Sequence, residues 1–163
     1  FNTLEKEWGS LDFVVHAIAF SDKEELKGKY VDTTLDNFLQ TMHISCYSFT
    51  SVMRRAKDLM KEGGSAVTLS YYGADKVVEN YNIMGPVKAA LESSVRYMAA
   101  ELGERDIRVY AVSPGPLRTR AASGIDHFDE LIEMARTRAP GHRLVDIADR
   151  VIAAEPDKPE AES

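Results

Sequence analysis

The sequence predicts an α/β fold in which helices pack on a doubly wound, parallel β-sheet. Three short apolar runs, at residues 11–18, 65–69 and 107–113, are typical of buried strands. Two long segments between them carry apolar residues every three or four positions, which is typical of helices. This alternation implies parallel strands joined by right-handed crossovers. Ligands of such folds bind beyond the carboxyl ends of the strands.

The first elements are the end of a helix and a strand. Residues 1–8 read as a helix end that Gly9 closes. The apolar run at 11–18 is nearly continuous, and such runs suit strands that are covered on both faces. We interpret His16, near its end, as a histidine whose hydrogen bonds are satisfied there, because the other three histidines show no metal-ligand spacing around it. The sequence therefore predicts no metal site.

A helix that begins at Thr33 or Thr34 follows a polar segment at 21–31, and either threonine can serve as its N-cap. Glycines 63 and 64 are expected to stop this helix before the strand at 65–69. We assign its apolar stripe to core or interface packing rather than to chemistry. The stripe consists of Leu35, Phe38, Leu39, Met42, Cys46, Phe49, Val52, Met53 and Ala56.

The second long helix spans about 83–102 and is expected to end at Gly103 in the left-handed conformation. The strand at 107–113 comes next, followed by a rigid turn at Pro114-Gly115-Pro116 and a short helix at about 128–137. The residues that the long helix should bury are Met84, Val87, Leu91, Val95 and Met98.

The composition fits one domain, with 44% hydrophobic residues in 163. The 26 acidic residues outnumber the 20 basic ones, and the net charge of −6 argues against a nucleic-acid-binding surface. Apolar runs are too short to span a bilayer, and the first residues lack the features of a signal peptide. The one cysteine, Cys46, cannot form an internal disulfide. We therefore expect a cytoplasmic protein whose partners include neither a membrane nor a nucleic acid.

The candidate catalytic residues lie around the start of the second long helix. Tyr81 and Lys88 are seven residues apart, which is two helical turns, so both side chains are expected on one helix face. The ammonium group of Lys88 could there lie close to both the phenol of Tyr81 and a sugar hydroxyl of a ligand. Tyr71 stands ten residues before Tyr81, directly after the second strand. This arrangement predicts a proton-donating site.

Several motifs lie in one order along the chain: His16-Ala17-Ile18-Ala19-Phe20, Ser70-Tyr71, Tyr81-x-x-Met84-x-x-x-Lys88, Arg96-Tyr97-Met98-Ala99, Pro114-Gly115-Pro116-Leu117-Arg118-Thr119 and Ala121-Ala122-Ser123-Gly124-Ile125. In this order they resemble the NADH-dependent enoyl-acyl carrier protein reductases, a divergent branch of the short-chain dehydrogenases. The resemblance covers 1–143 and implies a partial Rossmann-like domain with three α/β/α layers. Residues 144–163 diverge from the family, and we expect them to form a disordered acidic tail.

The resemblance implies a role for each matching residue. As catalytic residues it implies Tyr71, Tyr81 and Lys88. As cofactor-binding residues it implies Ala17, Ile18, Ala19, Lys88, Pro116, Leu117 and Thr119. As substrate-binding residues it implies Ala19, Phe20, Tyr71, Tyr81, Met84, Ala121, Ala122 and Ile125. Tyr81 would protonate the thioester oxygen, while Lys88 would hold the ribose hydroxyls and lower the pKa of the tyrosine through its charge.

The implied function is the reduction of trans-2-enoyl-acyl carrier protein to acyl-acyl carrier protein in fatty acid elongation. The implied cofactor is NADH, with NADPH as the alternative. The implied partners are an acyl carrier protein thioester and further copies of the chain. The helices from about 34 and about 83 resemble those that pair subunits in dimers or tetramers of the family.

Two alternatives stay open. The ten glycines never supply GxGxxG before a helix, and the glycine-rich βαβ part and last strand of the family find no match in the sequence. The sheet would then be incomplete with both outer edges unpaired, and the chain would be a non-catalytic fragment or interaction module. The other alternative is a short-chain carbonyl reductase, which requires Tyr-x-x-x-Lys and an upstream serine. Here Gly85, not Lys, stands four residues after Tyr81, although Ser70 could be mistaken for that serine.

Overall fold

The structure is a computed structural model that describes residues 1–114 and 128–138. Helices and strands alternate along the chain as the apolar pattern predicts. In order, they are α1 Asn2–Trp8, β1 Phe13–His16, α2 Lys23–Leu26, the 3-10 helix η1 Tyr30–Asp32, α3 Leu35–Met42, the π-helical turn η2 His43–Tyr47, α4 Ser48–Ala56, β2 Gly64–Leu69, η3 Tyr72–Ala74, α5 Met84–Leu102, η4 Gly103–Arg105, β3 Ile107–Val112 and α6 Phe128–Arg138.

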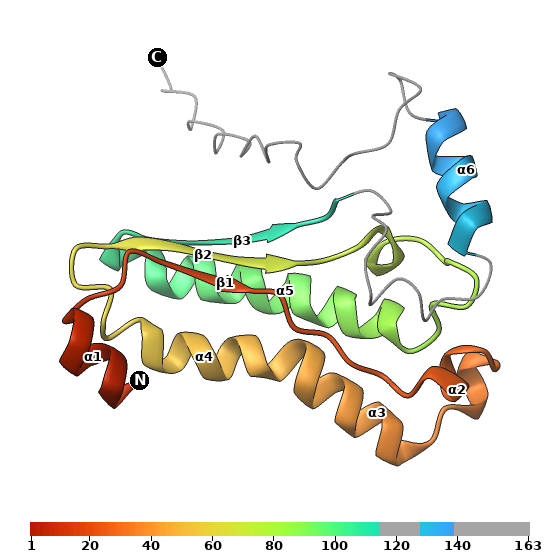
Figure 1. The fold of residues 1–163 in the computed structure, drawn as a ribbon, viewed down its shortest axis with the longest axis horizontal. Coiled ribbons are helices and arrows are strands. Elements are labelled where there is room, and N and C mark those ends of the chain that lie inside the picture. Colours follow the sequence, from red (N-terminus) through yellow and green to blue (C-terminus); the bar gives the residue numbers. More distant parts are fainter. Residues whose placement is uncertain (115–127, 139–163) are drawn as a thin grey trace.

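The three strands form one parallel sheet in the order β1-β2-β3. Phe13 pairs with Ser65 on one side of β2, and Gly64 pairs with Ile107 on the other. The strand arrows in Figure 1 all point toward the end of the molecule where α2 and α6 lie. The parallel α/β fold class is therefore confirmed, and the carboxyl ends of all three strands meet at one edge of the sheet.

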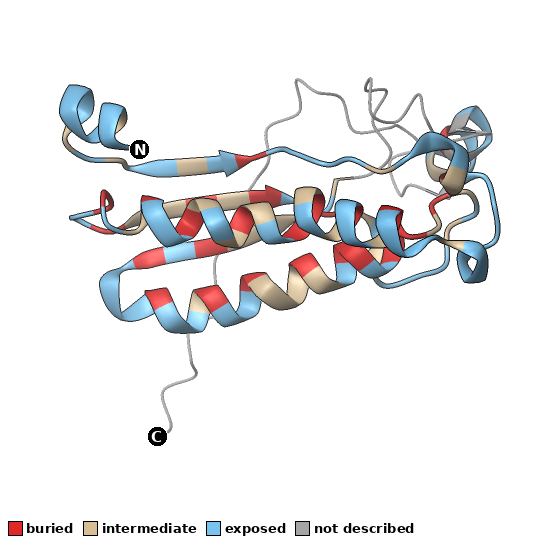
Figure 2. Ribbon diagram, turned by 90° about the horizontal axis from the view of Figure 1, so that it is seen from below, coloured by how far each residue is buried: buried red, intermediate tan, exposed pale blue. Residues whose placement is uncertain are grey.

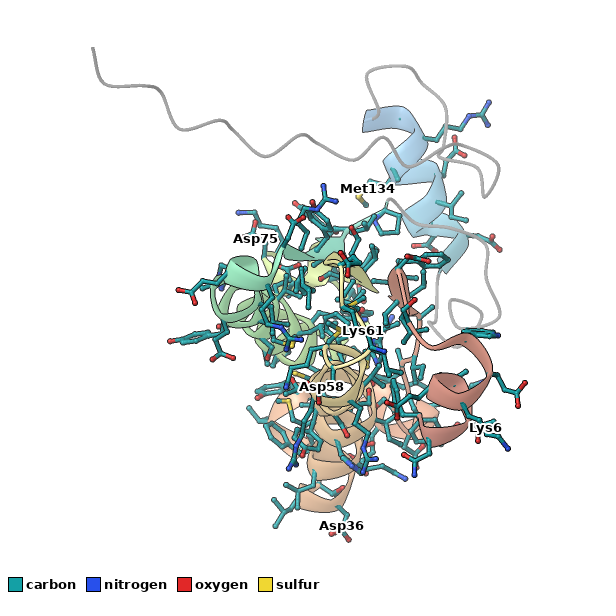
Figure 3. The ribbon with its side chains drawn as sticks, turned by 90° about the vertical axis from the view of Figure 1, so that its left-hand side faces the viewer. Lys6, Asp36, Asp58, Lys61, Asp75 and Met134 are labelled. Atoms are coloured by element: carbon teal, nitrogen blue, oxygen red, sulfur yellow. The ribbon has the colours of Figure 1, made fainter. Side chains whose placement is uncertain are left out.

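Helices α3, α4 and α5 cover one face of the sheet (Figure 1). Viewed along the strands, α6 with Met134 lies on the side of the sheet opposite α3 with Asp36 (Figure 3). The expectation that β1 would be covered on both faces is wrong for the residues that the structure describes. Phe13 and Val15 are 68% and 61% exposed, because alternate side chains of a strand point to the same face and none of the described helices lies over them.

The core lies between the sheet and the two long helical segments. Figure 2 shows buried bands that recur along these helices, whereas α1 and most of β1 are exposed. All five residues expected to be buried on α5, from Met84 to Met98, are buried. Thr34 caps α3 as predicted, since its hydroxyl accepts from the Asn37 amide at 3.2 Å. The periodic apolar pattern thus located both helices and their main buried faces.

Two expected helix ends differ from the structure. Gly103 has φ −58°, an ordinary helical value, and the left-handed residue is Asp106 at φ 54°. The chain leaves α5 through the extra turn η4 before it reverses, so the reversal falls three residues later. Helix α4 ends at Ala56 rather than at the paired glycines. Gly63, at φ 82°, instead begins the approach to β2, where a Cβ atom would lie 2.6 Å from the Asp106 carbonyl oxygen.

Part of the apolar stripe on α3 faces solvent rather than core. Leu35 and Leu39 are 70% and 57% exposed, while Cys46 and Phe49 further along are buried. The change falls at the π-helical turn, which contains Cys46, and its wider winding rotates the face that α4 presents relative to α3. Among the residues that the structure describes, no helix is long and apolar enough to cross a membrane.

Candidate active site

The candidate site begins where β2 ends. Tyr71 follows the strand and is half-buried, and its ring packs edge to face against the buried ring of Tyr81, with centroids 4.8 Å apart. The buried backbone of Gly73 lies against the Tyr81 ring. The structure thus brings together two of the three predicted catalytic residues at the edge where ligands of this fold bind.

Tyr81 is not on helix α5, so the helical spacing that suggested its pairing with Lys88 does not apply. The helix begins at Met84, and Tyr81 lies in the preceding turn between Asn80 and Asn82, which have φ angles of 57° and 41°. Asparagine tolerates this left-handed conformation better than most residues. The turn, rather than a helix face, aims the tyrosine inward.

Asn82 anchors this turn to a distant part of the chain. Its side-chain nitrogen donates to the carbonyls of Glu25 and Gly28, at 2.8 and 3.0 Å. The Thr33 hydroxyl donates to the Asn82 side-chain oxygen at 3.4 Å. The loop that carries Tyr81 is therefore held against the segment between α2 and α3.

Lys88 is 5% exposed, and its Nζ donates to the Leu69 carbonyl at 2.6 Å. Burial lowers the pKa of Lys88 to about 8, although the nearby Cys46 and Glu92 act in the opposite direction. The site therefore contains an ammonium group that loses its charge close to neutral pH. Cys46 itself is a free, buried thiol, as expected from the sequence.

The expected effect of Lys88 on the tyrosine is wrong. Burial, and next the neighbouring Tyr71, raise the pKa of Tyr81 well above its ordinary value. Burial also raises the pKa of Tyr71. Desolvation penalises the phenolate, and the charge of Lys88 is not among the causes of this shift. Both tyrosines are therefore protonated donors at neutral pH, and the Tyr81 hydroxyl has no hydrogen-bond partner among residues 1–114 and 128–138.

Two features argue against the short-chain carbonyl reductase alternative. The Ser70 hydroxyl donates to the Glu92 carboxylate instead of standing free as a substrate ligand. Gly85 is buried in the first turn of α5, where a Cβ atom would lie 3.0 Å from the Gly73 carbonyl oxygen. A side chain at this position, which would be lysine in that family, would press on the backbone of Gly73.

On the β1 side, His16 is buried and fully hydrogen-bonded, as predicted. Its Nε2 lies 2.7 Å from the Ser48 hydroxyl and its Nδ1 lies 3.0 Å from the Thr68 hydroxyl. Because Ser48 gives its proton to the Ile44 carbonyl, Ser48 accepts from Nε2–H. The Thr68 hydroxyl has one proton to donate, which serves either Nδ1 or the His16 carbonyl at 3.2 Å. Burial and the Lys88 charge lower the pKa of His16, which keeps the ring neutral.

The predicted ligand segment after β1 is exposed, including Ala17, Ile18, Ala19 and Phe20. Buried polar side chains from α3 and η2 hold it in place. The Ser45 hydroxyl bonds to both the amide and the carbonyl of Phe20, at 2.9 and 3.0 Å.

Polar side chains also bind the next two residues of this segment, Ser21 and Asp22. The Asn37 side-chain oxygen accepts from the Asp22 amide at 3.1 Å and from the Ser21 hydroxyl at 3.3 Å. Thr41, between Asn37 and Ser45 on the same face, donates to Asn37 at 3.2 Å. We call Asn37, Thr41 and Ser45 the polar seam.

The remaining predicted site residues have different outcomes. Met84 is buried in the core at the start of α5. The part of the chain that the structure describes does not include the other predicted ligand residues or the predicted tail. These are Pro116, Leu117, Thr119, Ala121, Ala122, Ile125 and residues 144–163. Within residues 1–114 and 128–138, no group of three His, Cys, Asp or Glu side chains could hold a metal ion.

Sequence reasoning missed four residues that shape the site: Gly73, Asn82, Glu92 and Asn37. Gly73 and Asn82 stand in the tyrosine-bearing loop, and a glycine and an asparagine there already indicate unusual backbone or close packing. Glu92 follows Lys88 by one helical turn, which places both on the same face of α5. The partners of Asn37 could not be read from the chain, because they come from the loop after β1.

The fold and the site define a doubly wound α/β protein with a protonated tyrosine pair and a buried lysine at its ligand-binding edge. The family model described as "Enoyl-(Acyl carrier protein) reductase" matches residues 1–154. The chain belongs to this family.

Named relatives are similar in sequence and in structure. The "Enoyl-[acyl-carrier-protein] reductase [NADH] 1" of Rhizobium meliloti is 58% identical over 147 residues, which cover 90% of this chain and 54% of that protein. The crystal structure of FabI from Candidatus Liberibacter asiaticus has a TM-score of 0.86 at 48% identity, covering 90% of this chain and 57% of that one. The reductase from Anaplasma phagocytophilum, crystallised with NAD, has a TM-score of 0.81 at 56% identity and covers 87% and 52%. The chain thus spans about half the length of the relatives it matches.

Proposed function

We propose that this chain forms the substrate side of an enoyl-[acyl-carrier-protein] reductase. The reaction is the reduction of a trans-2-enoyl thioester on acyl carrier protein with NADH, as in fatty acid elongation. The observation that carries the proposal is the packed pair of Tyr71 and Tyr81 at the carboxyl ends of parallel strands, with the buried Lys88 bonded to the Leu69 carbonyl two residues before Tyr71. Membership in the reductase family supports the same reaction.

Tyr81 is the proton donor in this proposal. Reduction at the β-carbon of an enoyl thioester places negative charge on the thioester oxygen, and a donor aimed there stabilises the transition state. The raised pKa of Tyr81 keeps its hydroxyl protonated at neutral pH. Tyr71, through its ring contact, fixes the orientation of the Tyr81 ring.

The residues present fit a nicotinamide cofactor. A lysine ammonium has three donors, and one of them is used by the Leu69 carbonyl, so two are available for ribose hydroxyls. The exposed Ala17 and Ala19 have small side chains that allow a ligand to approach the backbone. When bound, NADH supplies the hydride. The residues of this chain hold its ribose, orient the thioester and donate the proton.

Self-association is part of the proposal. Leu35 and Leu39 on α3, Tyr47 on η2 and Tyr97 on α5 are all more than half exposed. Large apolar side chains gathered on helices favour an interface with another copy of the chain, as a dimer or tetramer. We also propose a cytoplasmic location. The free, buried thiol of Cys46 is compatible with the reducing conditions of that compartment.

The test is titration of the chain with NADH and with NADPH, followed by nicotinamide fluorescence, and then addition of a crotonyl thioester. The same assay is applied to a chimera in which the rest of the Rhizobium meliloti reductase is joined to this chain. We expect the chimera to oxidise NADH with the enoyl thioester and not with a keto thioester. An inactive chimera that binds NADH would contradict the proposal, and turnover of the keto thioester alone would favour the carbonyl reductase. Activity confined to the chimera would identify the isolated chain as the non-catalytic half.

A further inference from the structure

Two side chains of α5 fasten the carboxyl end of β2. Lys88 donates to the carbonyl of Leu69, and the Ser70 hydroxyl donates to Oε1 of Glu92. Lys88 and Glu92 are four residues apart, so they are neighbours on one helix face. The last residue of the strand and the residue after it are therefore held by two consecutive turns of the helix.

Glu92 does more than accept this hydrogen bond. It is half-buried, and its charge favours the ammonium form of Lys88. The other titratable groups that act on Lys88 come from different elements. Cys46 on η2 acts in the same direction as Glu92, and His16 on β1 is held neutral. Glu92 is the carboxylate whose charge acts on the buried ammonium.

The position of Ser70 also controls the tyrosine pair. Ser70 is buried, its amide donates to the Val112 carbonyl at 2.8 Å, and Tyr71 follows it directly. Because the Tyr71 ring packs on Tyr81, a shift of Ser70 displaces the surface against which the proton donor rests.

We propose that Glu92 is a positioning residue of the active site, which fixes the end of β2 through the Ser70 hydroxyl and keeps the buried Lys88 ammonium charged. This inference rests on the function proposed above, but it concerns a residue that touches neither substrate nor cofactor there. Glu92 makes two separate contributions. Its negative charge acts on Lys88, and its hydrogen bond with the Ser70 hydroxyl acts on the positions of Tyr71 and Tyr81.

Two variants of the chimera separate the contributions. Glu92→Gln keeps an oxygen that can accept from Ser70 and removes the charge. Ser70→Ala removes the hydroxyl and keeps the charge. Glu101→Gln is the matched control, because Glu101 is an exposed carboxylate on the same helix.

The first readout is the pKa of Lys88, followed by NMR of its side-chain nitrogen and assigned with Lys88→Gln. We expect Glu92→Gln to lower it from about 8 by about 0.5–1 unit, as loss of a nearby opposite charge does. Ser70→Ala and Glu101→Gln should leave it within about 0.2 unit. Equal pKa values in Glu92→Gln and Glu101→Gln would overturn the inference, whether or not the chimera is active.

The second readout is the KM for NADH at two pH values. At about pH 6.5 Lys88 is charged in both proteins, so Glu92→Gln should stay within about 1.3-fold of the parent. At about pH 8.5 its KM should rise about threefold to eightfold, because less of its Lys88 is charged. Ser70→Ala should instead lower kcat at both pH values. A chimera with no activity but a shifted Lys88 pKa would refute the proposed function and retain the role of Glu92.

Discussion

Replacement of Gly73 tests the packing of the tyrosine pair directly. A Cβ atom at this position would lie 2.4 Å from Cδ1 and 2.7 Å from Cε1 of Tyr81, whereas carbon atoms in contact lie about 3.5–4.0 Å apart. In Gly73→Ala the Tyr81 ring must therefore move by about 1 Å. Overpacking of a buried site costs about 1–3 kcal/mol. At about 2–4 °C per kcal/mol for a chain of this size, Tm should fall by about 2–12 °C.

Gly103→Ala is the matched control for this change. Gly103 has helical φ and ψ angles, and nothing lies within 4 Å of a Cβ atom there. Alanine at such a position stabilises a protein by about 0.4–1 kcal/mol. Tm is measured by differential scanning calorimetry, and kcat is measured on the chimera. We expect Gly73→Ala to reduce kcat by up to about 100-fold, because a misplacement of about 1 Å has effects of that size. An unchanged kcat together with a Tm at or above that of Gly103→Ala would refute the packing argument.

Three further changes test single groups. Tyr81→Phe keeps the ring and removes the proton donor, so kcat with a crotonyl thioester should fall about 10²–10⁴-fold; unchanged turnover would contradict the assigned role. The pKa of His16 is lowered in the folded state, so protonation favours unfolding below about pH 6.5, and Tm should drop between about pH 7.5 and 5.5. His16→Gln should reduce this fall in Tm with decreasing pH. The control His43→Gln, at an exposed position, should leave the fall unchanged. Asn82→Ala loses three hydrogen bonds and should destabilise by about 1–3 kcal/mol. In Asn80→Ala, at a similar φ, a smaller loss of Tm is expected, and equal losses would show that backbone strain alone is responsible.

The sequence predicted the fold well where the pattern of apolar residues has one interpretation. On α5 the residues at three- and four-residue spacing are buried from Met84 to Met98, because this helix is packed along its length against the sheet. On α3 the same spacing includes Leu35 and Leu39, which are exposed. The spacing of apolar residues indicates that a helix face is buried, but it does not tell whether the same chain or another chain buries it.

The sequence predicted candidate residues for the site but not their geometry. The motif identified Tyr71, Tyr81 and Lys88, and the structure places the two tyrosines in contact. The predicted direction of the Tyr81 pKa shift was wrong, because the shift comes from burial and the neighbouring Tyr71, and burial depends on the tertiary fold. Gly73 and Glu92 were missed for the same reason, since their partners are known only once the loop and the strand are placed.

The π-helical turn at His43–Tyr47 has a consequence for how the chain tolerates changes in length. A turn of this kind amounts to one extra residue in an otherwise continuous α-helix. The turn absorbs this residue, so the backbone winding of α3 and α4 stays in phase across it. Deletion of one residue from the regular winding of α4 would instead rotate α3 by about 100° relative to the rest of α4. The polar seam would then face away from residues 20–22, the segment that it holds beside the candidate site. The angular phase between two halves of one helix therefore determines where residues 20–22 lie, so a change in length within the regular winding of α4 would act on the candidate site from a distance.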